Sequence, residues 1–323
     1  MKMTLISIIM AAVMFSCGHG NSEGDGTTGG DTAQATAATT VATFSGDSAL
    51  MLAQQQCDFG PRVPGTPAHA KCAEWLTATL RESCDDVTVQ TGTVTTGQGK
   101  QLGIKNIIGT INPNAERRIL LLAHWDTRPW ADKDPDESKR NEPVMGANDG
   151  ASGVAVLLQL ARQLKASGTS LGVDILLVDA EDMGIEEQEE SWALGAQYWA
   201  AHPHVAGYKP LFGILLDMVG APDAVFSREY YSLNYATSIV DEVWKHAAGS
   251  HFTNARGGAI TDDHVFINQA GIPCVDIIDM RTGNDSGFYD GWHTTHDTID
   301  RLSAATLGDV GQTLLNVIAD LEE

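Results

Sequence analysis

The sequence has few basic residues for its length. Its 323 residues include 20 Lys and Arg against 42 Asp and Glu, which gives a formal net charge of −22. Such a chain has little with which to neutralise phosphates, so nucleic acid is not expected as a partner. A cationic group, such as the free amine of a peptide, suits this charge better. Acidity that serves only solubility is the alternative interpretation.

The chain also lacks closely spaced cysteine pairs. Apart from Cys17, its cysteines are Cys57, Cys72, Cys84 and Cys274, and none of them has Cys-X-X-Cys spacing. This argues against a zinc site built from thiolates. An exported protein could form disulfides. However, Cys72 and Cys84 lie at opposite ends of one predicted helix, too far apart to pair, and the sequence assigns no disulfide.

Long apolar runs are missing too, except at the N-terminus, where Leu5 to Phe15 are largely apolar. Met1-Lys2 before this run and Ser16-Cys17 after it predict a secretory signal peptide over residues 1–17, too short to span a membrane. The stretch resembles a bacterial lipoprotein signal in which Cys17 is lipidated. An ordinary cleaved signal and a buried apolar N-terminus are the alternatives.

The lipoprotein resemblance implies export in a Gram-negative bacterium, with a lipid anchor holding the protein in the periplasm or on the cell surface. Residues 18–45 are rich in Gly, Ser, Thr, Asp and Ala and contain no aromatic residue before Phe44. We therefore expect a flexible tether there. Residues 46–323 are long enough for a single catalytic domain, which we expect to be monomeric.

Apolar strand patterns alternate with helical patterns along this domain. Strands are predicted over residues 87–90, 105–110, 118–124, 173–178, 212–217 and 273–278. Helices are predicted over residues 66–81, 151–166, 191–201, 235–248 and 303–321. Several strands are entirely apolar, as strands covered on both faces are. The fold class is therefore α/β, a three-layer α/β/α sandwich with a mixed, mostly parallel central sheet.

Acidic residues and histidines lie where ligands bind in such a sheet, at the carboxyl ends of strands. Five separate places supply them: His124 with Asp126, Asp149, Glu181 with Asp182, Asp217, and His293. Each has a plain alternative, since Asp149 could cap a helix and His293 could be structural. Together they favour a metal. Carboxylates with a neutral imidazole suit Zn²⁺ in a catalytic site.

This pattern resembles the zinc aminopeptidase-like clan (peptidase family M28-like), which also shares the segment Phe59-Gly60-Pro61-Arg62-Val63-Pro64-Gly65-Thr66. The resemblance implies that Glu181 is the general base and that Asp149, Asp182 and His293 are the zinc ligands. His124 and Asp217 stand where two-metal peptidases bind a second ion. Asp126 would either join that second site or support it from behind.

Three features make the chain similar to one branch of the clan, the bacterial glutaminyl-peptide cyclotransferases. They are Trp292 before His293, the segment Thr261-Asp262-Asp263-His264-Val265-Phe266, and the segment His124-Trp125-Asp126-Thr127-Arg128-Pro129. The resemblance implies conversion of an N-terminal Gln of a peptide or protein to pyroglutamate, with release of ammonia and one zinc ion. Asp217 and Asp262 would then hold the leaving amide, with Asp217 not a ligand, and Glu181 would carry the proton.

Trp292, Trp192 and Phe288 would wall the small substrate pocket, although core packing is an equal alternative for Trp192. The chain departs from animal cyclases at Asp182, where they have Glu, and at Asp276, near which they have a histidine. The loop 128–142 either borders the mouth of the pocket or is a plain surface insertion, and the second interpretation is favoured. His296-Asp297 is interpreted as local bracing rather than as a second metal site.

Two other functions stay open. A two-zinc aminopeptidase that hydrolyses N-terminal residues would use the same ligand positions. An inactive peptide-binding lipoprotein is the third possibility, although pure binding would not need the base Glu181.

Overall fold

The computed structural model describes residues 41–283 and 286–323. The predicted signal peptide, with Cys17, and most of the predicted tether lie outside these residues. Phe44 is 6% exposed and belongs to the core, so the packed chain begins just before the expected residue 46. Within the described ranges, no helix has the length and apolar character needed to cross a membrane.

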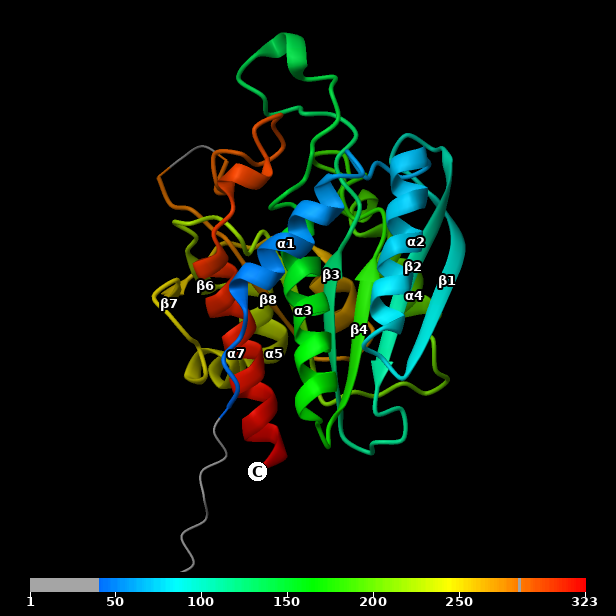
Figure 1. Cartoon of the computed structure of the whole chain (residues 1–323). Coiled ribbons are helices and arrows are strands. Elements are labelled where there is room, and N and C mark those ends of the chain that lie inside the picture. The colour runs from blue at the N-terminus through cyan, green and yellow to red at the C-terminus, as the bar shows by residue number, and fades with distance from the viewer. Residues whose placement is uncertain (1–40, 284–285) are drawn as a thin grey trace, which may run out of the picture. The chain divides into compact units, whose positions relative to one another are not determined.

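A six-stranded sheet in the order β1-β2-β4-β3-β5-β8 forms the centre of the domain (Figure 1). Its strands are β1 (Asp86–Thr95), β2 (Gln101–Ile111), β3 (Arg118–His124), β4 (Gly172–Val178), β5 (Gly213–Asp217) and β8 (Cys274–Ile278). The four strands β4, β3, β5 and β8 run parallel, whereas β2 is antiparallel to β1 and to β4. The prediction of a mixed, mostly parallel sheet is therefore confirmed.

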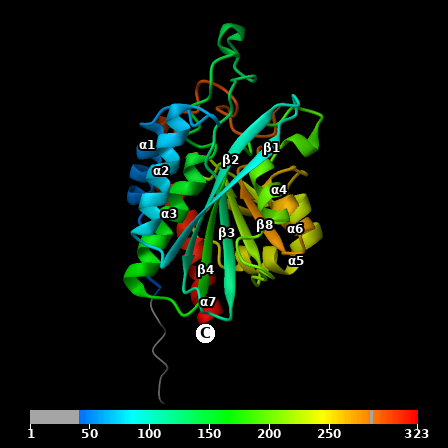
Figure 2. The ribbon, with the colours of Figure 1, turned by 90° about the vertical axis from the view of Figure 1, so that its right-hand side faces the viewer.

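Helices cover both faces of this sheet (Figure 2). One layer comprises α1 (Gly46–Cys57), α2 (Pro67–Arg81), α3 (Ala151–Ser167) and α7 (Ala304–Glu322). The other comprises α4 (Leu194–Ala201) and α6 (Asp263–Gln269), with α5 (Tyr230–Lys245) packed beside β8. Smaller elements are β6 (Phe226–Arg228), β7 (Phe252–Arg256) and the 3₁₀ turns η1 (Glu137–Lys139), η2 (Glu189–Ser191) and η3 (Ile299–Arg301).

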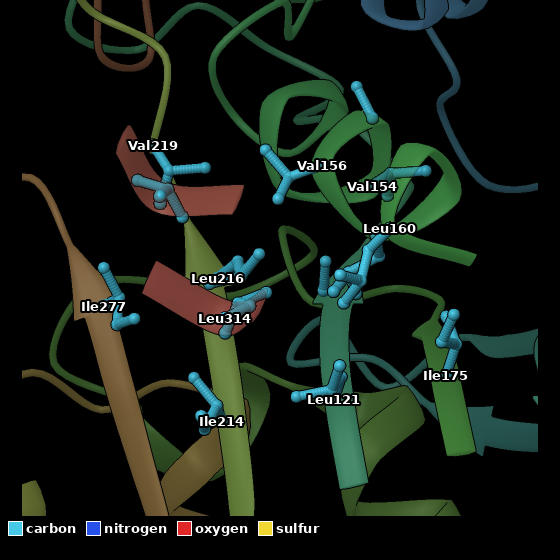
Figure 3. Close-up of a cluster of buried hydrophobic side chains, with 14 of the residues drawn as sticks. Leu121, Val154, Val156, Leu160, Ile175, Ile214, Leu216, Val219, Ile277 and Leu314 are labelled. Carbon is cyan, nitrogen blue, oxygen red and sulfur yellow. The ribbon is translucent and has the colours of Figure 1, made fainter. Parts of the chain in front are cut away.

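The apolar run of β3 explains the two layers. Successive side chains of a strand point to opposite faces, so Leu121 packs with the α1, α2, α3 and α7 layer while Leu122 packs with α4 and α6. Figure 3 shows Leu121 in the first cluster, beside Val154 and Leu160 of α3. Burying a leucine stabilises the fold by about 1.5–3 kcal/mol, so a polar residue on either face of β3 would be costly.

Local signals fix several helix ends. Thr66 caps α2 by accepting a hydrogen bond from the His69 amide, and Pro67 stands at the helix start, as predicted. Gly153 lets α3 lie close to the sheet, because a Cβ there would come 2.2 Å from the Leu216 carbonyl oxygen.

No disulfide links the four cysteines of the described residues. Cys57, Cys72, Cys84 and Cys274 are all free thiols.

Some boundaries differ from the predictions. The helix expected over 191–201 begins only at Leu194, because Ala193 adopts a left-handed φ of 54°. The helix expected over 235–248 spans Tyr230–Lys245, and its start is set by Glu229, whose carboxylate accepts the amides of the first turn. Helices α1 and α6 were not predicted at all.

Candidate active site

The parallel strands bring their carboxyl ends to one edge of the sheet. His124 is the last residue of β3, Asp217 is the last of β5, and Glu181 and Asp182 follow β4. Asp149 lies just before α3, whose N-terminus faces the same edge. His293 comes from the loop between β8 and α7. The fold thus gathers residues that are far apart in the sequence.

Asp149 stands between two histidines. Its Oδ1 is 3.0 Å from His124 Nε2, and its Oδ2 is 3.7 Å from His293 Nε2. His293 Nε2 also lies 3.1 Å from Asp182 Oδ1. His124, Asp149 and Asp182 each offer a ligand atom, and these atoms lie within 4.8 Å of one another. Asp149 and Asp182 therefore lie close to both imidazoles.

This cluster fits a divalent metal ion. Asp182 is only 1% exposed, and neither of its carboxylate oxygens has a well-aligned hydrogen bond, although Oδ1 lies 3.1 Å from His293 Nε2. A buried carboxylate left without hydrogen bonds is costly unless a cation compensates it. Carboxylate oxygens with imidazole nitrogens are a donor set that zinc uses in catalytic sites.

The charges in the cluster follow from its burial. Burial raises the pKa of Asp149 well above its ordinary value, and the nearby Asp182 raises it further. Burial acts in the same direction on Asp182, but His293 and Arg128 outweigh it and lower its pKa to about 2. Burial also lowers the pKa of His293. An ionised Asp182 and a neutral His293 are the forms that bind metal.

Glu181 projects from a strained turn beside the cluster. The preceding residue, Ala180, has a φ of 57°, a conformation that non-glycine residues seldom adopt. Asp126 holds the turn, since its two carboxylate oxygens accept the amides of Glu181 at 3.0 Å and Asp182 at 3.2 Å. Burial, followed by the charge of Asp262, raises the pKa of Glu181 well above its ordinary value. Glu181 therefore holds a proton more readily than an exposed glutamate does.

Asp217 and Asp262 lie in the same cavity as Glu181. Asp217 Oδ1 is 3.2 Å from His124 Nε2. Asp262 caps α6 through the Asp263 amide, and its Oδ2 has no hydrogen-bond partner. Burial and then the charge of Asp217 raise the pKa of Asp262 to about 7.

A cavity of about 230 Å³ opens onto these residues. Trp192, Phe288 and Trp292 all line it, together with Asp149, Glu181, Asp182, Asp217, Asp262 and His293. The Trp292 ring stacks on His293 with centroids 3.8 Å apart, and Phe288 lies 4.5 Å from Trp292. Trp192 is parallel to His293 at 6.0 Å. The three aromatic residues named from the sequence therefore all face this cavity.

Glycine at position 150 is required by the packing of the cluster. A Cβ there would lie 2.4 Å from His124 Nε2.

The backbone is also strained at two residues of the site. His293 has a φ of 53°, and Met218, which follows Asp217, has a φ of 49°. Strained backbone of this kind is concentrated at functional sites.

Arg128 was not recognised as a site residue from the sequence. It is 1% exposed, and its Nη1 donates to the backbone oxygens of Asp182 and Gly184. Its guanidinium lies 4.8 Å from the Trp192 ring centre and pairs with Asp132 at 2.7 Å. The one sequence signal that could have indicated a site role is its position, four residues after His124, which ends the buried strand β3.

The loop 128–142 therefore borders the cavity through residues 128–134, as one of its two interpretations expected, and the favoured interpretation as a plain surface insertion is wrong for these residues. Asp132 Oδ1 lies 3.6 Å from His293 Nδ1, and Lys133 pairs with Glu186 at the cavity. Asp134 also ties the loop down, because its Oδ2 accepts the hydroxyl of Thr295 at 2.6 Å. The prediction failed because charge and proline are equally common in surface loops.

Two further acids have structural roles. Asp297 accepts hydrogen bonds from the Asn148 amide at 2.8 Å and the Asp149 amide at 3.1 Å. Of the pair His296-Asp297, it is therefore Asp297 that provides the expected local bracing. Asp179, the first acid after β4, is bonded to His69 at 2.8 Å and to the Lys105 amide. It is absent from the cavity lining.

Comparisons with known proteins agree with this architecture. A family model described as Peptidase family M28 matches residues 106–318. The solved structure of a glutaminyl cyclase from Bacteroides thetaiotaomicron, bound to N-acetylhistamine, is 46% identical with a TM-score of 0.84, over 87% of this chain and 99% of that chain.

A leucine aminopeptidase precursor from the same species is also 46% identical, with a TM-score of 0.83 over 87% of this chain and 99% of that chain. The glutaminyl-peptide cyclotransferase of Drosophila melanogaster is 28% identical over 273 residues, which are 76% of this chain and 73% of that protein. Because the family model covers more than half of the sequence, the chain belongs to peptidase family M28.

Proposed function

We infer that this protein is a glutaminyl-peptide cyclotransferase, which converts the N-terminal glutamine of peptides and proteins to pyroglutamate and releases ammonia. The observation that carries the inference is the aromatic cavity with Glu181, a buried acid of raised pKa, beside the Asp149, Asp182 and His293 cluster. Similarity to glutaminyl cyclases over most of the chain supports it.

We propose that Asp149, Asp182 and His293 hold one zinc ion. When bound, zinc would polarise the side-chain amide carbonyl of the substrate and stabilise the negative charge that develops on its oxygen. The donor types support this assignment, as do the distances of His293 Nε2 from Asp182 Oδ1 (3.1 Å) and from Asp149 Oδ2 (3.7 Å). Asp126 would support the site from behind through the amides of Glu181 and Asp182.

Glu181 would move the proton. The α-amine nitrogen of glutamine forms a bond to its own side-chain carbonyl carbon, and the bond from that carbon to the amide nitrogen breaks. Glu181 accepts a proton from the attacking amine and donates it to the departing nitrogen, which leaves as ammonia. A raised pKa brings the proton affinity of a carboxyl closer to that of a nitrogen base, which suits a group that must both accept and donate a proton.

The remaining cavity residues would position the substrate. Asp217 and Asp262 would accept hydrogen bonds from the leaving amide, because both line the cavity next to Glu181. Trp292, Trp192 and Phe288 would fold the glutamine side chain back onto its amine. The reaction is intramolecular, so this orientation supplies a large part of the rate enhancement.

A second candidate function is a two-zinc aminopeptidase. The contacts of His124 with Asp149 at 3.0 Å and with Asp217 at 3.2 Å favour it, since these three residues would suit a second ion. The similarity to a leucine aminopeptidase precursor points the same way. On the cyclase proposal His124 instead orients Asp149 and Asp217 through hydrogen bonds.

Incubation with a Gln-initiated and a Leu-initiated peptide separates the two. The cyclase proposal predicts loss of one ammonia from the first peptide and no cleavage of the second, with Glu181→Gln inactive on both. Cleavage of the Leu-initiated peptide without ammonia release would establish the aminopeptidase.

We also propose that the protein is exported and anchored to the membrane through a lipid on Cys17, facing the periplasm or the cell surface of a Gram-negative bacterium. The apolar run ending at Cys17 and the Gly- and Ser-rich segment after it support this. Metabolic labelling with a fatty acid should mark the wild type and not Cys17→Ser.

A further inference from the structure

Acidic side chains gather at the mouth of the substrate cavity. Glu186, Glu187 and Glu189 line the cavity and are exposed, and we refer to these three as the acidic rim. None of the residues described as lining the cavity is Lys or Arg. The mouth of the cavity is therefore negatively charged. The whole chain is acidic as well, but at the mouth three carboxylates lie close together.

The acidic rim is continuous with a site built to hold a ligand. Deeper in the same cavity, the 3% exposed Asp262 has a carboxylate oxygen without a hydrogen-bond partner, as does the 1% exposed Asp182. The N-terminal glutamine of a substrate would occupy this deep part. The residues that follow glutamine must then leave through the mouth, past the acidic rim.

The acidic rim belongs to an ordered turn. The Ile185 amide donates to the hydroxyl of Ser191 at 2.8 Å, and Trp192 Nε1 donates to the Ile185 carbonyl at 3.2 Å. Ser191 is only 3% exposed. The turn that carries the acidic rim is thus tied to Trp192, one of the cavity walls.

One neighbouring cation reduces this charge in part. Lys133, from the loop 128–142, pairs with Glu186, and its Nζ lies 5.8 Å from the Trp292 ring centre. No ion pair within the described residues engages Glu187 or Glu189. Those two carboxylates are available to a charged group of the substrate.

We propose that the acidic rim makes the enzyme select peptides in which Lys or Arg follows the N-terminal glutamine, and disfavour those with Asp or Glu there. This rests on the proposed cyclase function. Exposed ion pairs are weak, so we expect a preference of about three- to tenfold in kcat/KM at low salt. Salt should weaken it, because exposed charges are screened.

The test compares Gln-Lys, Gln-Leu and Gln-Glu peptides by ammonia release, at low and at high salt. We expect the order Lys, Leu, Glu at low salt and a smaller spread at high salt. The double variant Glu187→Gln/Glu189→Gln should lower the Lys-to-Glu ratio at least threefold. Lys133→Gln, which leaves Glu186 uncompensated, should raise it.

The matched control is Glu74→Gln/Glu116→Gln, which changes the net charge equally at residues outside the cavity lining. Its ratio should equal that of the wild type. Cyclisation of all three peptides with a ratio that is near one, or that changes equally in both double variants, overturns the selectivity and leaves the cyclase function standing. Absence of ammonia from every peptide overturns both.

Discussion

The carboxylate of Asp297 supports Asp149 from behind: its Oδ2 accepts the backbone amide of Asp149 at 3.1 Å, while its Oδ1 accepts the amide of Asn148 at 2.8 Å. Burial raises the pKa of Asp297 to about 6, despite the bonds it accepts. The position of a proposed zinc ligand thus depends on a residue 148 positions away in the chain.

Asp297→Asn should therefore weaken metal binding. An amide offers one oxygen where the carboxylate offers two, so one of the two backbone amides loses its acceptor. Changes behind a metal ligand lower affinity about 10–100-fold, and competition with a chelator would measure this. Asp300→Asn, three residues on and exposed, is the control and should bind zinc like the wild type. Equal affinity in both variants would show that Asp297 does not position Asp149.

Glu181→Gln should lower kcat about 10²–10⁴-fold on a Gln-initiated peptide. The reason is that glutamine cannot accept the proton of the attacking amine. Zinc content should stay at the wild-type level, because Glu181 is not among the proposed ligands. A variant that keeps more than a tenth of the wild-type kcat would exclude Glu181 as the proton carrier.

Arg128→Met should destabilise the fold. It leaves Asp132 without its cation and removes a donor from the Asp182 and Gly184 carbonyls, which are buried groups. Because the Asp132 side chain is 28% exposed, the cost comes mainly from the buried carbonyls that lose their donor, about 1–3 kcal/mol, and urea unfolding would measure it. Arg140→Met is the comparison, since Arg140 forms an exposed pair with Glu137, worth less than about 1 kcal/mol. Equal losses in the two variants would contradict the role given to Arg128.

Asp262→Asn should change how stability depends on pH. The pKa of Asp262 is raised to about 7 in the fold, so the folded state binds a proton that the unfolded state releases from about pH 4 upward. Stability from this group is therefore fully present below about pH 4 and is lost progressively as pH rises from about 4 to about 7. Asparagine cannot ionise and still caps α6.

The variant should accordingly gain stability over the wild type as pH rises from 5 to 8. The shift from 3.8 to about 7 corresponds to about 4 kcal/mol, of which pH 5 to 8 covers the larger part. Urea unfolding at the two pH values measures the difference. An advantage that is constant with pH would show that Asp262 is not protonated in the fold.

The fold could be predicted largely from apolar patterns. Strand β3 has the predicted bounds Arg118–His124, because its run of aliphatic residues is buried on both faces. Helix α6 was missed because it spans only Asp263–Gln269, too short for a helical period to be seen. Helix α5 was placed too late in the chain because Glu229 is not among the usual capping residues.

The site was accessible from the sequence to the extent that its residues follow buried strands. His124, Glu181, Asp182 and Asp217 all do so, and parallel neighbours bring them together. The supporting residues were not accessible in this way. Arg128 is buried only because the carbonyls of a distant turn receive its hydrogen bonds, and no local pattern indicates that contact.

The central claim is that one divalent ion is held by Asp149, Asp182 and His293. Crystals of the zinc-loaded protein, measured on both sides of the zinc absorption edge, test it directly. The account predicts a single anomalous peak within coordinating distance of Asp149, Asp182 and His293. No peak there, or a second peak of equal height between His124 and Asp217, would contradict it.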